Sequence, residues 1–110
     1  MSETQAWRLP LEPDLTFEFE APLWLYSGKG AWHFVTLPAE VAEGIRLLSG
    51  PRPGFGQLPV AARIGTTAFR SSIFPDAKSG SYLLPVKADV RKKEGLLAGD
   101  PVRVSLTVNP

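Results

Sequence analysis

The sequence predicts an all-β domain: a closed six-stranded barrel, capped by two short helices. Several short segments alternate apolar and polar residues with a period of two, which is typical of strands with one buried face. Turns rich in glycine and proline separate these segments, and only two short stretches show helical spacing. Six strands of this length cannot bury their faces as one flat sheet, so we expect the sheet to close on itself.

The first two predicted strands form a hairpin. Apolar residues alternate from Leu15 to Leu25, and Pro22 predicts an edge or a bulge midway. A turn at residues 27–30 leads into a second strand over residues 31–37. The first-strand residues expected to face the core are Leu15, Phe17, Phe19, Ala21, Leu23 and Leu25, and those on the other face are Glu18, Glu20, Trp24 and Tyr26.

The rest of the chain supplies two helices and four strands. The spacing of Val41, Ile45 and Leu48 predicts a helix over residues 39–48. Strands follow over residues 58–64, 67–74 and 81–84, then a helix over 88–94 that stops at Gly95, and a last strand over 102–108. Leu37-Pro38 ahead of Val41 is echoed by Leu84-Pro85 ahead of Val90, which suggests two similar halves with approximate twofold symmetry.

Length and composition favour a single domain in a reducing compartment. The 110 residues divide into a flexible N-terminal segment, 1–13, and one barrel domain, 14–110. The chain has no cysteine, which excludes disulfides, thiolate metal sites and cysteine nucleophiles. Residues 1–13 show no signal-peptide pattern, and no apolar run could span a bilayer. We therefore expect a cytoplasmic protein, a monomer or weak dimer, with no membrane partner.

Charge is distributed unevenly along the chain. Residues 1–55 carry four Lys or Arg against seven Asp or Glu, whereas residues 56–110 carry eight against four. This asymmetry either marks a basic face or reflects ordinary variation among exposed turns and strands.

Three segments resemble a known family. They are residues 31–38 (AWHFVTLP), residues 70–75 (RSSIFP), and residues 80–87 (GSYLLPVK) followed by Val90-Arg91 and Gly99-Asp100. Over about residues 14–108 the chain resembles the bacterial family known as domain of unknown function number nineteen hundred and five. The resemblance implies a double-split β-barrel capped by short helices. It implies no activity, because none is assigned to the family.

A second pattern is similar to the looped-hinge-helix domains of transition-state regulators and antitoxins. It comprises residues 84–87, Val90-Arg91, residues 96–100 and Val102. Those domains dimerise to complete a similar barrel and bind DNA, so nucleic-acid binding is an alternative function here. The net charge of only +1 argues against it, because duplex binding at physiological salt needs several phosphate contacts.

No residue pattern predicts catalysis, a metal or a cofactor. His33, the only histidine, alternates with apolar Val35 and Leu37, and we interpret it as structural. Glu18 and Glu20 are interpreted as a solvated outer face, and Ser71 and Ser72 lack a nucleophile-elbow motif. The glycines form no phosphate-binding loop.

The leading hypothesis is a non-enzymatic module that binds a small anionic ligand or an acidic protein partner. The candidate residues are Trp32, Arg63, Arg70, Tyr82, Lys87 and Arg91. Lys87 and Arg91, four apart, would share one helix face and supply charge, and Trp32 and Tyr82 would supply apolar contact. Large aromatic residues in a small barrel are, however, more typical of the core. An uncharacterised enzyme and an accessory subunit are the remaining alternatives.

Overall fold

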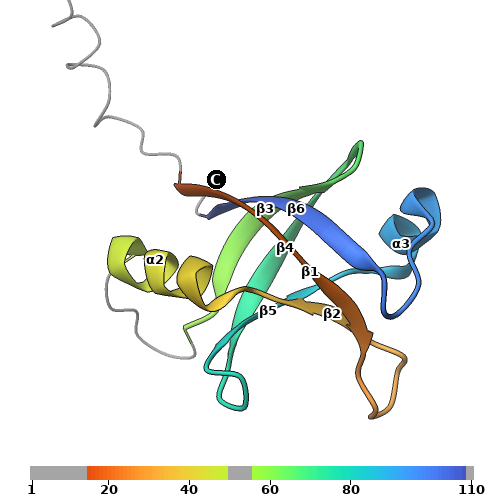
Figure 1. Ribbon diagram of the computed structural model, residues 1–110, viewed down its shortest axis with the longest axis horizontal. Coiled ribbons are helices and arrows are strands. Elements are labelled where there is room, and N and C mark those ends of the chain that lie inside the picture. Colours follow the sequence, from red (N-terminus) through yellow and green to blue (C-terminus); the bar gives the residue numbers. More distant parts are fainter. Residues whose placement is uncertain (1–14, 50–55, 109–110) are drawn as a thin grey trace, which may run out of the picture.

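The computed structural model describes residues 15–49 and 56–108, and these fold into one barrel (Figure 1). The predicted flexible segment, 1–13, and Phe55 of the predicted loop lie outside the described residues. The elements, in chain order, are β1 (Leu15–Leu25), β2 (His33–Thr36), α2 (Ala39–Ser49), β3 (Leu58–Ile64), β4 (Thr67–Asp76), β5 (Ser81–Pro85), α3 (Ala88–Glu94) and β6 (Pro101–Val108).

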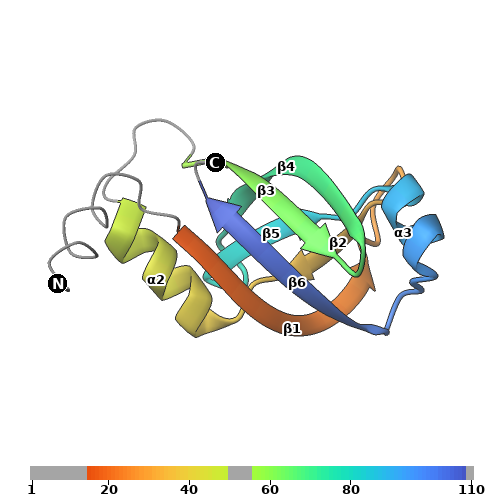
Figure 2. The same cartoon turned by 90° about the horizontal axis from the view of Figure 1, so that it is seen from above.

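The described strands close into a six-stranded antiparallel barrel, as the sequence predicts. Their order around the barrel is β1-β2-β5-β4-β3-β6, and every neighbouring pair is antiparallel. The two helices lie at opposite ends of the barrel in both views (Figures 1 and 2). Neither described helix is long and apolar enough to cross a membrane.

Two long strands each serve two sheets. In β1, residues 15–22 pair with β6 and residues 23–25 pair with β2. In β4, residues 67–73 pair with β3 and residues 74–76 pair with β5. The first sheet therefore contains β6, β3 and the N-terminal parts of β1 and β4. The second sheet contains β2, β5 and the C-terminal parts of β1 and β4. Pro22, predicted at an edge or bulge, ends the β1–β6 ladder opposite Pro101, where β1 passes to the second sheet.

The inward side chains form one core. Val35, Ile73, Leu84 and Leu106 are fully buried, and removing such side chains from water contributes about 1.5–3 kcal/mol each. Leu25 contradicts the predicted face pattern, because it is 49% exposed. It is the last residue of β1, paired with half-buried His33, so the alternation carries it to the rim rather than into the core.

The barrel consists of two topologically equivalent halves, β1-β2-α2-β3 and β4-β5-α3-β6. The β2–β5 register centres on Val35 opposite Leu84 and makes these two residues equivalent. The same relation makes Ala39 and Ala88, the first residues of the two helices, equivalent. Val41 and Val90 correspond as the sequence suggests, but Pro38 corresponds to Lys87 rather than to Pro85. An approximate twofold axis therefore runs between β2 and β5.

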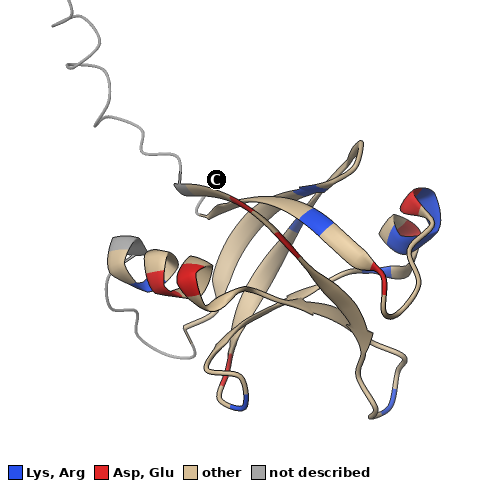
Figure 3. Ribbon diagram, in the orientation of Figure 1, with Lys and Arg blue, Asp and Glu red and all other residues tan. Residues whose placement is uncertain are grey.

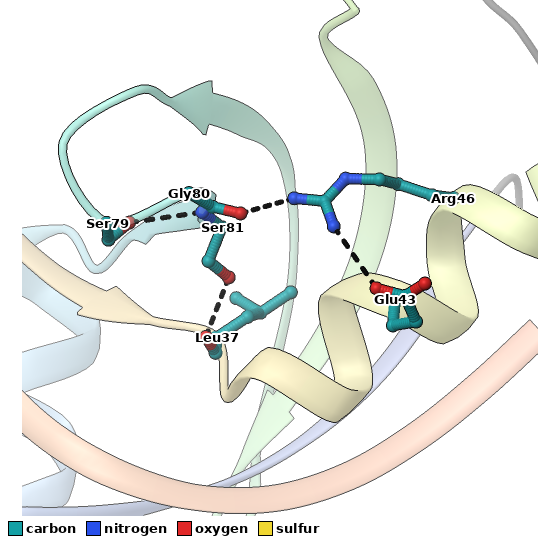
Figure 4. A network of polar contacts seen from close by, with 6 residues as sticks. All are labelled: Leu37, Glu43, Arg46, Ser79, Gly80 and Ser81. Carbon is teal, nitrogen blue, oxygen red and sulfur yellow. Dashed lines mark hydrogen bonds and ion pairs between the residues drawn. The ribbon is translucent and has the colours of Figure 1, made fainter.

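Polar contacts fix α2 on its end of the barrel (Figure 4). The buried Ser81 hydroxyl donates to the Leu37 carbonyl at 2.7 Å, at the junction between β2 and α2. The Arg46 guanidinium donates to the Gly80 carbonyl and lies 3.8 Å from the Glu43 carboxylate. At the other end, the Thr67 hydroxyl donates to the Glu94 carboxylate at 2.6 Å, and Gly95 ends α3 with φ 65°, as predicted.

Replacing Ser81 with Ala is expected to lower the free energy of unfolding by about 1–3 kcal/mol, because the Leu37 carbonyl loses this donor in a buried setting. Urea denaturation measures the change. Ser72→Ala is the matched control, since its hydroxyl bonds to no described residue. Equal destabilisation by the two substitutions would show that the buried hydrogen bond contributes nothing.

Candidate ligand-binding groove

A groove of about 680 Å³ lies on the outer face of the second sheet. It runs between the β1–β2 turn and the β4–β5 turn, which extend from the same side of the barrel (Figure 1). Its lining consists of Trp24, Leu25, Tyr26, Ser27, Trp32, Phe34, Phe74, Asp76, Lys78 and Leu83, and we call it the aromatic groove. Because the two turns are equivalent under the approximate twofold, the groove straddles that axis.

The floor of the groove consists of two equivalent pairs. Trp24 of β1 lies opposite Phe34 of β2, and Phe74 of β4 lies opposite Leu83 of β5. The Trp24 and Phe34 rings are 5.3 Å apart, and the Trp24 indole donates to the Thr36 hydroxyl at 2.9 Å, which fixes the ring. The expectation that large aromatics fill the core is wrong for Trp24 and Trp32, which strand alternation directs outward, but it is confirmed for Tyr82, which is buried.

One wall of the groove is aromatic, formed by Tyr26 and Trp32. Trp32 is 52% exposed and stacks nearly parallel to Phe34, with ring centroids 6.1 Å apart. Tyr26 is 48% exposed and meets Phe34 edge-on at 6.3 Å. A Cβ on Gly28 would lie 2.2 Å from the Tyr26 ring, and one on Gly30 would lie 2.9 Å from the Trp32 ring. The two glycines therefore leave room for both rings.

The backbone at the end of this turn is strained. Ala31, directly before Trp32, has φ 51°, and Gly30 before it has φ 92°. A left-handed conformation at a residue with a Cβ costs roughly 1–2 kcal/mol, and such strain concentrates at binding sites.

The other wall is polar, formed by Asp76 and Lys78. The Asp76 carboxylate accepts hydrogen bonds from the Ser79 hydroxyl at 2.7 Å and the Ser79 amide at 3.1 Å. The Ser79 side chain is the main cause that lowers the pKa of Asp76 below its usual value, so this carboxylate is ionised at neutral pH. Asp76 thereby orders the turn that positions Lys78.

A second, smaller depression adjoins the groove at Trp32. It has a volume of about 340 Å³, and its lining includes His33, Lys87 and Arg91. One Arg91 nitrogen donates to the Val86 carbonyl at 2.7 Å, so this guanidinium also supports the entry to α3. Trp32, Lys87 and Arg91 are the three sequence-predicted site residues that the fold brings together.

The other three candidates lie elsewhere. Arg63 and Arg70 are exposed on the outer face of the first sheet, where Arg63 adjoins Glu18 and Arg103. Tyr82 is buried in the core, with the Arg46 guanidinium 5.7 Å above its ring. The six predicted residues therefore do not form one site, because strand alternation directs these side chains to different faces.

Two of the residues considered for catalysis, His33 and Glu20, make polar contacts within the fold. The His33 Nδ1 lies 3.0 Å from the Ala31 carbonyl, which can only accept, so this nitrogen donates. Glu20 pairs with Arg103 at 3.5 Å on the exposed face of the first sheet, as the predicted solvated face requires. Within residues 15–49 and 56–108, no cluster of three or more His, Asp or Glu side chains could hold a metal ion.

Sequence reasoning missed Phe34 and Phe74 as site residues. The alternation of residues 31–37 already placed Trp32 and Phe34 on the face opposite Val35, and that signal could have identified the aromatic wall. No sequence pattern indicated that Phe74 belongs to the groove. It lies there because β4 changes partner from β3 to β5 at this residue.

These features define a class: a capped, double-split β-barrel with an aromatic groove across its second sheet. Residues 19–106 match the model of the family described as domain of unknown function (DUF1905). The chain belongs to this family, as the motifs in its sequence suggested. No curated protein matches the chain significantly.

Replacing Gly28 with Ala is expected to displace the Tyr26 ring from Phe34 while changing stability by no more than about 0.5 kcal/mol, because the exposed ring can rotate away. NMR shifts of the Phe34 ring protons report the displacement. Tyr26→Ala is the reference and should shift them similarly. Unchanged Phe34 shifts in Gly28→Ala would show that the glycine does not set the ring position.

Replacing Asp76 with Asn is expected to destabilise the protein at neutral pH but not in acid. The folded state lowers the pKa of Asp76, so its ionisation stabilises the fold above the unfolded pKa of about 3.9, and this stabilisation is lost as the pH falls through the folded value. Urea denaturation of both proteins across this range measures the difference. A difference that stays constant with pH would assign the effect to something other than ionisation.

Proposed function

We propose that the protein is a non-enzymatic binding module whose ligand combines a flat apolar part with negative charge. The observation that carries this proposal is the aromatic groove, where exposed rings lie near Lys78 and Lys87, neither of which is in a described ion pair. The proposal retains the anionic ligand or acidic partner expected from sequence and keeps Trp32, Lys87 and Arg91 as contacts. It replaces Arg63, Arg70 and Tyr82 with the groove residues.

The exposed aromatic surface supports a ligand with a flat apolar part. Trp32, Tyr26 and Phe74 expose 52%, 48% and 38% of their surface on one face of a small domain. Covering apolar surface contributes about 25 cal/mol per Å², and stacking of rings adds about 0.5–1.5 kcal/mol. The Trp24–Thr36 hydrogen bond fixes the Trp24 ring, and Trp32 is stacked on Phe34, so part of the aromatic surface is already ordered when a flat ligand binds.

The charged half is supported by the cations around Trp32. The groove and the adjoining depression are lined by Lys78, Lys87 and Arg91, with Asp76 as their one described carboxylate. Asp76 is occupied by Ser79. The described ion pairs are Arg46–Glu43 and Arg103–Glu20, so neither Lys78 nor Lys87 forms one, although, alongside the Ser79 side chain, the charge of Lys78 helps to lower the pKa of Asp76. An anionic group at either end of the groove would therefore gain attraction without breaking an ion pair among the described residues.

Binding is favoured over catalysis because, among the described residues, the His33 side chain bonds only to the Ala31 carbonyl and pairs with no serine hydroxyl or carboxylate. A monomer is favoured over a regulator-like dimer because one chain supplies all six strands of the closed barrel. The cysteine-free composition supports a cytoplasmic location.

The test uses 2-naphthoate, a probe that is both flat and anionic, followed by NMR titration. We expect 2-naphthoate to shift resonances of Trp32, Phe34 and Lys87. In Trp32→Ala we expect its binding affinity to fall roughly tenfold, about 1.4 kcal/mol. Lys87→Ala should weaken it less. Lys87 is preferred to Arg91 here because Arg91 also supports the Val86 carbonyl.

Two comparisons make this test specific. The neutral analogue 2-naphthylmethanol should bind to the natural protein more weakly than 2-naphthoate does, and the difference in affinity between the two probes should be smaller in Lys87→Ala. Leu97→Ala removes a side chain that is 73% exposed outside the groove and should leave binding unchanged. If 2-naphthoate does not bind, or binds with the same affinity to Trp32→Ala, the proposal fails.

A further inference from the structure

We infer that the ligand of the aromatic groove is single-stranded nucleic acid, with successive bases stacked across the second sheet. This inference rests on the proposed function, because it assigns a chemical class to the same groove. A nucleic-acid strand has a planar, apolar base and an anionic phosphate in every unit.

The groove is longer than one flat ring. Its floor crosses four strands, from Trp24 on β1 through β2 and β5 to Phe74 on β4. Neighbouring strands are about 4.8 Å apart, so this row spans about 14 Å. The exposed rings come from both halves of the barrel, with Tyr26 and Trp32 at the β1–β2 turn and Phe74 on β4. Separate ring platforms suit a chain of bases better than a single small molecule.

The lysines are also dispersed. Lys29 lies in the β1–β2 turn, Lys78 in the β4–β5 turn and Lys87 beyond Trp32 at the start of α3. In Figure 3 both turns carry a basic segment, and the β4–β5 turn also carries an acidic one. A compact anion would need cations converging on one point, whereas a phosphodiester backbone has charges at intervals. Point charges on flexible lysines can follow such a backbone.

The chemistry of the lining predicts which nucleic acids bind. The side chains of the groove that could hydrogen-bond to base edges are those of Tyr26, Ser27, Trp32, Asp76 and Lys78, and all of them lie on the walls, whereas the floor of Phe34, Phe74 and Leu83 is apolar. Stacking on aromatic rings tolerates any base. The faces of paired bases are covered by their neighbours within a duplex. We therefore expect binding that is weakly sequence-dependent and strongly selective for single strands.

The experiment is fluorescence anisotropy with a labelled oligothymidylate of about 12 nucleotides, a length of the order bound by one small barrel. A duplex and an abasic oligomer of equal length are titrated in parallel and should bind at least about tenfold more weakly. Trp32→Ala and Phe74→Ala should each weaken oligothymidylate binding by roughly 5- to 100-fold, the range seen for loss of one stacking ring. Leu97→Ala is the exposed apolar control and should bind normally.

Salt dependence tests the charged contacts. Three phosphate contacts predict a slope of about −2 when the logarithm of the binding constant is plotted against that of the salt concentration, at about −0.7 per contact on a single strand. Lys78→Ala should reduce the slope by about 0.7, whereas Arg70→Ala, on the outer face of the first sheet, should leave it unchanged.

The outcomes separate this inference from the proposed function. Binding of both probes, each weakened in Trp32→Ala and with oligothymidylate also weakened in Phe74→Ala, supports both. Binding of oligothymidylate without binding of 2-naphthoate overturns the proposed small-ligand site and, because the inference rests on that site, the inference with it. Binding of 2-naphthoate without binding of oligothymidylate overturns the nucleic-acid assignment alone. Binding of both probes, with oligothymidylate unaffected by the groove variants or no tighter than the abasic oligomer, also overturns it. If neither probe binds, both proposals fall.

Discussion

Closure of the sheet is the constraint on which the rest of this structure depends. Six short strands can bury their apolar faces and satisfy their edges only by forming a ring, and β1 and β4 make the ring possible by passing from one sheet to the other. At each passage the strand changes partner while its alternation continues. Leu23 and Ile73, on either side of these transitions, are both fully buried, so the core remains continuous across the two sheets.

The repeated topology of the two halves places the groove, and the differences between the halves give it chemical character. Equivalent strands supply the Trp24–Phe34 and Phe74–Leu83 pairs of the floor, and equivalent turns supply the walls. The residues on those turns differ, with Tyr26 and Trp32 on one and Asp76 and Lys78 on the other. A nearly symmetric frame thus presents an aromatic side and a polar side, which would orient an asymmetric ligand.

The two helical caps are also equivalent in position and different in their contacts. At the α2 end, Arg46 and Ser81 donate to backbone carbonyls, and Tyr82 lies beneath the guanidinium. At the α3 end, Arg91 donates to the Val86 carbonyl, and Lys87 lies beside the exposed Trp32. The first end is therefore closed around a buried tyrosine, whereas the second adjoins the groove and extends it with positive charge.

The sequence alone determined the strands, the helices and the closed barrel, because period-two alternation and turn residues are local properties of the chain. Alternation also showed that Trp32 and Phe34 share a face, although not whether that face was covered. Only the tertiary structure decided which side chains meet. Phe74 joins Trp24 across the second sheet because β4 changes partner, Tyr82 is withdrawn into the core, and Arg63 and Arg70 lie on the outer face of the other sheet. These outcomes depend on the register between strands distant in sequence, which local patterns do not specify.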